Sequence, residues 1–142
     1  MNISNVIAKG QLVPLTFMQD AVAASQSDVQ LKIAEVASAA ANDVDEICIP
    51  WSGEIVGISF DLTPAGSAGT LTVGATINGI EDADTTQTIT TAVRGSAKVK
   101  RGSAQFAAGD YIGVEITSDG SWNGTTTDLL VTVWVLVNLA GI

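Results

Sequence analysis

The chain has 142 residues, of which 46% are hydrophobic and 15% are charged, as expected for one folded domain. Its net charge of -9 argues against free nucleic acid as a partner, because a phosphate backbone needs a concentrated basic surface. The sequence contains no histidine, which excludes Ser-His-Asp and Cys-His nucleophilic sites within one chain and removes the commonest metal ligand.

Residues 1–27 differ in pattern from the rest of the chain. Their apolar residues follow no steady period, and Pro14 favours an extended backbone around it. The run 16–19 (Thr-Phe-Met-Gln) matches a capping box, which predicts a short helix through Ala24. We therefore expect an N-terminal arm that either folds back on its own domain or reaches a neighbouring subunit.

Targeting signals are not evident in the sequence. Residues 1–25 lack the basic start, continuous apolar centre and cleavage site of a signal peptide, and residues 129–137 are far shorter than the ~20 residues of a membrane helix. The single cysteine, Cys48, rules out an internal disulfide and is predicted to be a small buried residue. We expect synthesis in the cytoplasm and no membrane partner.

From residue 28 onward the sequence predicts β-strands. In residues 106–116, Ile112, Val114 and Ile116 alternate with residues of the opposite face, which is the period of a half-buried strand. Similar runs occupy 29–33, 47–51, 54–62, 71–77 and 85–93, and Asn78-Gly79 is a strong hairpin signal. Around eight short strands predict an all-β domain over residues 28–142, a single jelly-roll-like β-sandwich.

The last predicted strand, 128–138, is apolar on both of its faces. One face carries Leu129 and four valines, and the other face is dominated by three large residues. A strand covered on both sides suggests a sheet partner on one face and a subunit interface on the other. The predicted interface residues are Leu130, Trp134 and Leu136.

Candidate chemistry is sparse. The carboxylates fall in turns or on outward strand positions, and no spacing singles out an acid–base pair for glycoside hydrolysis. Glu81, Asp82 and Asp84 supply oxygen ligands, but they lack the Asp-x-Asp-x-Asp-Gly pattern of a Ca²⁺ loop. We expect no catalytic residue, no cofactor and no metal site.

Two further features are candidates for partner binding. One is a basic cluster, which serves either as edge charge against aggregation or as a surface for an acidic patch on another protein. The other is Trp122 beside a turn, a possible sugar platform or interface anchor, whereas Trp51 is predicted to lie in the core. The basic cluster consists of Arg94, Lys98, Lys100 and Arg101.

Residues 48–137 resemble a jelly-roll module of tailed-bacteriophage virions. The resemblance rests on residues 49–55 (Ile-Pro-Trp-Ser-Gly-Glu-Ile), the loop 65–67 (Ala-Gly-Ser), 76–79 (Thr-Ile-Asn-Gly) and 106–112 (Phe-Ala-Ala-Gly-Asp-Tyr-Ile). Such modules occur in capsid decoration proteins and in tail and fibre proteins. A short chain with only a small arm looks more like a decoration, or cement, protein than like a fibre.

The resemblance implies a non-enzymatic protein on the capsid surface of the virion, a homotrimer that bridges subunits of the major capsid protein. Its arm would reach the capsid and neighbouring copies. A receptor-binding tail or fibre module that uses the loops around Gly66, Asp84 and Trp122 is the alternative, and a small hydrolase is a further one. The arm residues expected to touch a partner are Leu12, Val13, Leu15 and Phe17.

Overall fold

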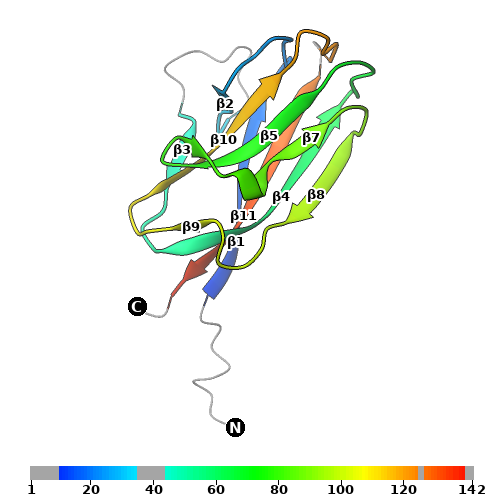
Figure 1. Ribbon diagram of the computed structural model, residues 1–142. Helices are drawn as coiled ribbons and strands as arrows, with labels where there is room; N and C mark the ends of the chain where they lie inside the picture. Colours follow the sequence, from blue (N-terminus) through cyan, green and yellow to red (C-terminus); the bar gives the residue numbers. More distant parts are fainter. Residues whose placement is uncertain (1–9, 35–43, 125–126, 140–142) are drawn as a thin grey trace.

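The computed structural model describes residues 10–34, 44–124 and 127–139, and these fold into two antiparallel sheets packed face to face (Figure 1). This confirms the expected all-β sandwich. Among these residues, no helix is long and apolar enough to cross a membrane. The first nine residues of the expected arm lie outside the described residues.

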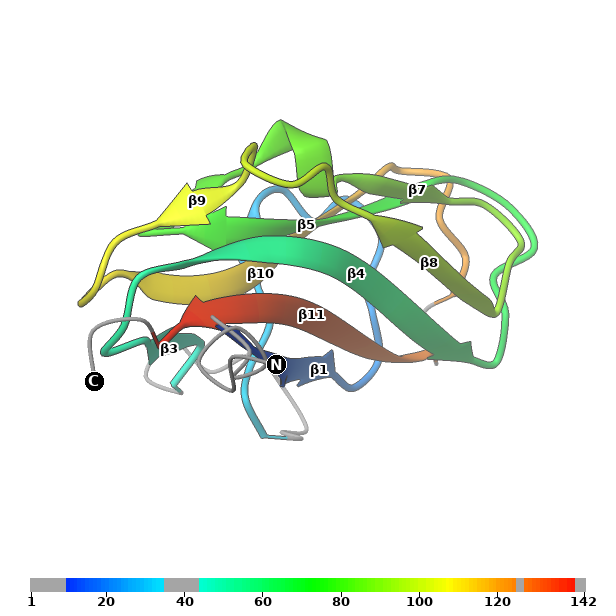
Figure 2. The same cartoon turned by 90° about the horizontal axis from the view of Figure 1, so that it is seen from below.

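The first sheet, called here the β11 sheet, has the strand order β1-β11-β4-β8. Figure 2 shows β1, β11 and β4 side by side along its length. A fifth, short strand, β9, pairs with the beginning of β4. The strands are β1 (Gly10–Gln19), β4 (Gly53–Thr63), β8 (Arg94–Lys98), β9 (Gln105–Phe106) and β11 (Asp128–Asn138).

The second sheet, called here the β10 sheet, follows the order β2-β10-β5-β6, with β3 also on β10 and β7 also on β5. A single 3-10 turn, η2 (Ala83–Thr85), links β6 to β7 in the described part of the chain. The strands are β2 (Val29–Gln30), β3 (Glu46–Cys48), β5 (Leu71–Ile77), β6 (Ile80–Glu81), β7 (Gln87–Ile89) and β10 (Tyr111–Ser118).

The core lies between the sheets and follows the predicted alternation. On β11, Val131, Val133 and Val135 are fully buried, and the residues between them face outward. On β10, Ile112, Val114 and Ile116 are buried in the same way. Apolar burial of this kind is the main stabilising term of a sandwich.

The structure corrects the expected arm. Residues 10–19 form β1, which pairs with β11 in unbroken register from Gly10↔Asn138 to Gln19↔Leu129. The helix predicted from residues 16–19 is therefore not formed, because Phe17 packs into the core at 0% exposure and fixes an extended backbone. Residues 20–28 connect β1 of this sheet to β2 of the other one, so the described part of the expected arm belongs to the sandwich.

Pro14 lies on the free edge of the β11 sheet. Met18 exchanges two backbone hydrogen bonds with Lys32, on the side away from β11. Pro14 lies four residues before Met18, so its backbone nitrogen points to the same side, away from β11. Proline has no N–H to donate, but no hydrogen bond to β11 is lost. A proline at this point leaves a gap in the row of donors and discourages another strand from adding to the edge.

Two of the motifs that carry the sequence resemblance, 76–79 and 106–112, form one hydrogen-bonded corner. Asp110 accepts hydrogen bonds from the Ala107 N–H (2.7 Å) and from the Asn78 side-chain amide (2.9 Å). The Asn78 side-chain oxygen in turn accepts from the Tyr111 N–H (3.1 Å). These bonds lower the pKa of Asp110 and tie the Asn-Gly hairpin to the start of β10. The motif is therefore turn chemistry that fixes the fold.

Candidate interaction surface

The outer face of the β11 sheet carries an uncovered apolar strip, because no described element packs over β1 and β11 on this side. Pairing places Leu12 beside Leu136, Pro14 beside Trp134 and Met18 beside Leu130. Leu12 is 53% exposed, and the others are partly or fully exposed. This apolar strip is defined as Leu12, Pro14, Met18, Leu130, Trp134 and Leu136.

Trp134 is held in a defined orientation on this strip. Its Cβ and Cδ1 lie 3.7 Å from where a Cβ on Gly57 would be, so the tryptophan covers the glycine of the neighbouring strand. The indole N–H donates a hydrogen bond to the Ser59 hydroxyl (3.3 Å). A β-bulge between Trp134 and Val135 accompanies this arrangement. An aromatic side chain fixed in this way is a suitable interface anchor.

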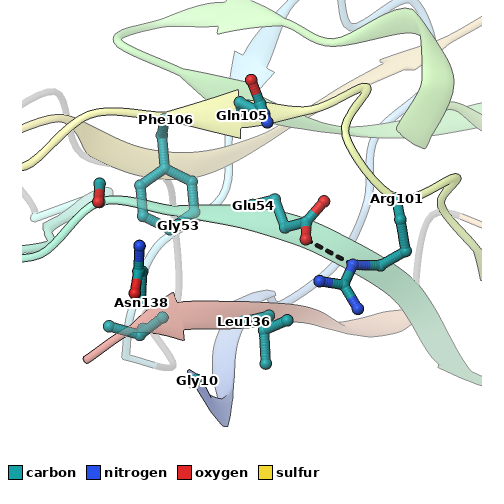
Figure 3. Close-up of a pocket in the computed structure, with 10 residues that line it drawn as sticks. Gly10, Gly53, Glu54, Arg101, Gln105, Phe106, Leu136 and Asn138 are labelled. Carbon is teal, nitrogen blue, oxygen red and sulfur yellow. Dashed lines mark hydrogen bonds and ion pairs between the residues drawn. The ribbon is translucent and has the colours of Figure 1, made fainter. Parts of the chain in front are cut away.

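A hollow of about 690 Å³ adjoins one end of the apolar strip, where β4 begins and β11 ends (Figure 3). It shares Leu136 with the strip, and the ring of Phe106 covers Gly53 at its wall. Glu54 is the single carboxylate among the lining residues and pairs with Arg101. The hydrogen bond from the Gly102 N–H, together with Arg101, lowers the pKa of Glu54 against the opposing effect of burial.

The residues that line the hollow do not include a pair of carboxyl groups for acid–base catalysis. A glycosidase needs two carboxyl groups that face one substrate, whereas the partners of Glu54 are the Arg101 guanidinium and the Gly102 N–H. The hollow instead extends the apolar strip with polar groups at its rim, which is the composition of a docking surface.

The basic cluster is divided: Arg101 lines the hollow, whereas Arg94 and Lys98 lie toward the opposite side of the same sheet face. Arg94 and Lys98 lie on β8, the other edge strand, and Arg94 pairs with Asp61 of β4. Lys98 and Lys100 are exposed. The outer face of the β11 sheet therefore passes from apolar on β1 and β11 to charged on β4 and β8.

The expected positions of the two loop tryptophans are reversed in the structure. Trp122 is 2% exposed, and its indole N–H donates to the Val22 carbonyl at 3.2 Å. It fits against Gly66 and Gly124, where a Cβ would collide with its ring, so it is no platform for a ligand. Trp51 is 44% exposed, and Cys48, predicted to be buried, is exposed as well.

The expected arm residues divide between the two sides of β1. Leu15 and Phe17 are buried in the core and Val13 is partly buried, so these three face inward. Leu12 alone faces outward and joins the apolar strip. Pro14 and Met18 were not predicted as members of this surface, although the alternation Val13, Leu15, Phe17 indicates an inward face and hence an outward one.

No family model and no curated protein matches this sequence. Among solved structures, the fold is similar to a chain in the acid-stable capsid of Helicobacter pylori bacteriophage KHP30, with a TM-score of 0.45 and 14% identity over 91% of this chain and 94% of that one. It is also similar to a chain of Turnip Yellow Mosaic Virus, with a TM-score of 0.32 and 13% identity over 90% and 93%. At these values neither likeness assigns a role to this chain.

Proposed function

We propose that this protein is a non-enzymatic structural protein of a virion, a decoration or cement protein that binds the outer surface of a phage capsid as an oligomer and bridges its subunits. The observation that carries the proposal is the apolar strip on the outer face of β1 and β11. The sequence resemblance to phage decoration modules supplies the class of particle.

The order of strand pairing supports a jelly roll. The short strands β2 and β3 both border β10, β6 and β7 both border β5, and β8 and β9 both border β4. Each such pair of short strands counts as one position. The pairing is then nested: β1 with β11, β2 and β3 with β10, β4 with β8 and β9, and β5 with β6 and β7. This nested order is that of an antiparallel ribbon rolled into two sheets, as in viral jelly rolls.

The apolar strip supports self-association as the mode of assembly. Copies of a chain with a net charge of -9 repel one another, so they approach best through a face without charge. The strip contains no charged side chain, and Trp134 and Leu136 provide large apolar contacts. We propose a closed homotrimer, in which Leu12 and the predicted interface residues meet neighbouring copies.

The contact with the major capsid protein is assigned to the charged half of the same face. Lys98 and Lys100 are exposed, and Lys98 of β8 shares a shallow hollow with Trp134 of the apolar strip. Both lysines suit an acidic patch on the capsid. Many copies on one shell add avidity to a modest single contact. The arm contact was expected at Leu12, Val13, Leu15 and Phe17, and of these four Leu12 is the one that faces outward and remains available to a partner.

The alternative of a receptor-binding tail or fibre module has less support. Its sugar platform was expected at Trp122, which is buried and hydrogen-bonded within the domain. The loops around Gly66 and Asp84 then lack an aromatic surface of that kind. A glycan array with strong, selective hits would favour this alternative.

The test is to measure the mass of the purified chain in solution and its co-sedimentation with undecorated capsids of the parent phage. The variant Leu136→Glu places a charge in the apolar strip, and Thr72→Glu places the same charge on the outer face of the β10 sheet as a matched control. We expect a trimer that binds capsids for the wild type and the control, and a monomer that binds weakly for Leu136→Glu. A monomeric wild type that ignores capsids would overturn the proposal.

A further inference from the structure

The outer face of the β10 sheet holds two carboxylates that meet over a glycine. Glu115 of β10 lies directly opposite Gly74 of β5, and Glu81 of β6 reaches over the same glycine. A Cβ on Gly74 would collide with the Glu81 carboxylate, so only glycine leaves room for it. Both carboxylates therefore neighbour Gly74, Glu115 as its register partner and Glu81 with Oε1 close to where a Cβ would be. Glycine inside a strand often marks a site of close approach.

Two oxygen atoms beside this pair are buried and lack a hydrogen-bond partner. Thr76 is 0% exposed and Gln30 is partly buried. Among the described residues, neither the Thr76 hydroxyl oxygen nor the Gln30 side-chain oxygen has a hydrogen-bond partner. Both converge on Gly113, at 2.8 Å and 3.0 Å from where its Cβ would be. Unpartnered buried oxygens of this kind are uncommon in folded proteins.

The four side chains form one contiguous group. Thr76 is the register partner of Glu81 on one side and of Gly113 on the other. Gln30 donates its amide N–H to Glu115 at 3.3 Å, and its side-chain oxygen lies over Gly113, as the Thr76 hydroxyl does. Two glycines on adjacent strands, Gly74 and Gly113, leave room for these side chains over the sheet.

We propose that Glu81, Glu115, Gln30 and Thr76 form a binding site for a hard divalent cation, with Ca²⁺ as the expected ion. Two carboxylates, an amide oxygen and a hydroxyl oxygen are ligands that Ca²⁺ prefers, with water completing its shell. No three Asp, Glu, His or Cys side chains gather around one point in the described residues. The proposed ligand set therefore contains two carboxylates, with a combined charge of −2. This inference is independent of the proposed function, because the site is on the opposite sheet from the apolar strip.

The electrostatics of the group favour a cation. Burial, the hydrogen-bonding contact with Glu81 and the charges of Glu81 and Asp28 together raise the pKa of Glu115 to about 6. Glu46 of β3 lies beside Gly113 and adds a further negative charge. No basic residue of the described chain takes part in the ion pairs or hydrogen bonds of these carboxylates. A bound cation would relieve a repulsion that the fold otherwise keeps.

The test uses the full chain and CaCl₂, with NaCl added to equal ionic strength in the reference sample. We expect the unfolding midpoint Tm at pH 7.5 to rise by several degrees with Ca²⁺ concentration, as mass action requires for a ligand of the folded state. The rise should be smaller at pH 5, where protons compete for Glu115. Isothermal titration with Ca²⁺ gives the affinity directly.

Three variants locate the site. Glu115→Gln keeps the shape and removes one charge, so we expect a higher Tm without Ca²⁺ and loss of the Ca²⁺ response. Thr76→Val removes only the hydroxyl, so we expect an unchanged net charge and a several-fold weaker affinity. Asp84→Asn removes an exposed carboxylate of η2 and should respond as the wild type does.

Two results would overturn the inference. One is an unchanged Tm up to ~10 mM Ca²⁺, which lies above the dissociation constant of about 1 mM of weak protein Ca²⁺ sites. The other is an equal response in the wild type and in a Glu81→Gln, Glu115→Gln double variant, which would assign the effect to general charge screening. Neither result depends on whether the chain binds capsids.

Discussion

The two outer faces of this sandwich are built from the same alternation of strand residues, yet they differ in chemistry. On the β11 sheet the outward positions of β1 and β11 are mostly apolar, including Leu12, Trp134 and Leu136, and the Thr16–Thr132 pair is the polar interruption between them. On the β10 sheet the outward positions are small, polar or acidic, including Gly113 and Glu115. Because burial between the sheets does not dictate outward residues, this difference reflects what each face meets outside the domain.

The largest expected effect comes from removing β1 from the sheet, since the apolar face exists only if β1 is in place. Phe17→Ala deletes a ring that is 0% exposed and should reduce the free energy of unfolding by about 3–5 kcal/mol. Urea unfolding followed by tryptophan fluorescence measures this loss. Thr16→Ala, at the adjacent exposed position, should change stability by no more than about 0.5 kcal/mol. Equal effects of the two changes would mean that β1 is not packed on the core.

The second effect is on assembly rather than on folding. Leu12→Glu combined with Leu136→Glu puts two charges side by side in the apolar strip. Leaving buried charges unpaired costs several kcal/mol, so we expect self-association to weaken about a hundredfold or more. Analytical ultracentrifugation over a range of concentrations measures it. Unchanged association would move the subunit interface to another surface.

The third effect is a pH dependence specific to the acidic face. The folded protein keeps the proton of Glu115 up to about pH 6, whereas the unfolded chain releases it near the ordinary value of 4.5. The folded state therefore binds more protons in this window, and stability should fall as pH rises from about 4.5 to about 6. Glu115→Gln should remove this fall. A difference between wild type and variant that stays constant from pH 4.5 to 7 would contradict the assignment.

The smallest effect concerns the orientation of Trp134. Ser59→Ala removes the hydroxyl that accepts the indole N–H, and we expect a loss of about 0.5–1.5 kcal/mol in monomer stability. The near-ultraviolet circular dichroism of the variant should weaken if the indole becomes mobile. Ser96→Ala, at a neighbouring outward position of β8, is the matched control.

Strands with a long, regular alternation were predicted correctly from the sequence. The error on β1 falls where the alternating run is short. The alternation on β10 and β11 identified both the buried valines and the outward Leu130, Trp134 and Leu136. On β1 the capping-box match at residues 16–19 competed with that alternation, and tertiary packing of Phe17 decided for a strand. The helix or strand preference of a short segment does not reflect such a contact, because β11 follows much later in the chain.

The positions of the loop tryptophans could not be predicted from local pattern. Trp122 is buried because loops distant in sequence close over it: Gly66 and Gly124 admit its ring, and Gly69 admits its backbone. The contact between Glu81 and Glu115 has the same origin, since it depends on register across Gly74. In each case the deciding neighbour is distant in sequence, and only the register of the sheets brings the residues together.

The pairing of β1 with β11 sets the order of events in the life of the chain. The first described strand has to remain unpaired on this side until the last one has left the ribosome, because its register partners are at the far end of the sequence. Long-range closure of this kind slows folding to the millisecond-to-second range. A truncated or half-finished chain has no complete apolar strip to present to other copies. Synthesis of β11 is thus a condition for forming the apolar strip, and a chain that lacks β11 cannot present this surface.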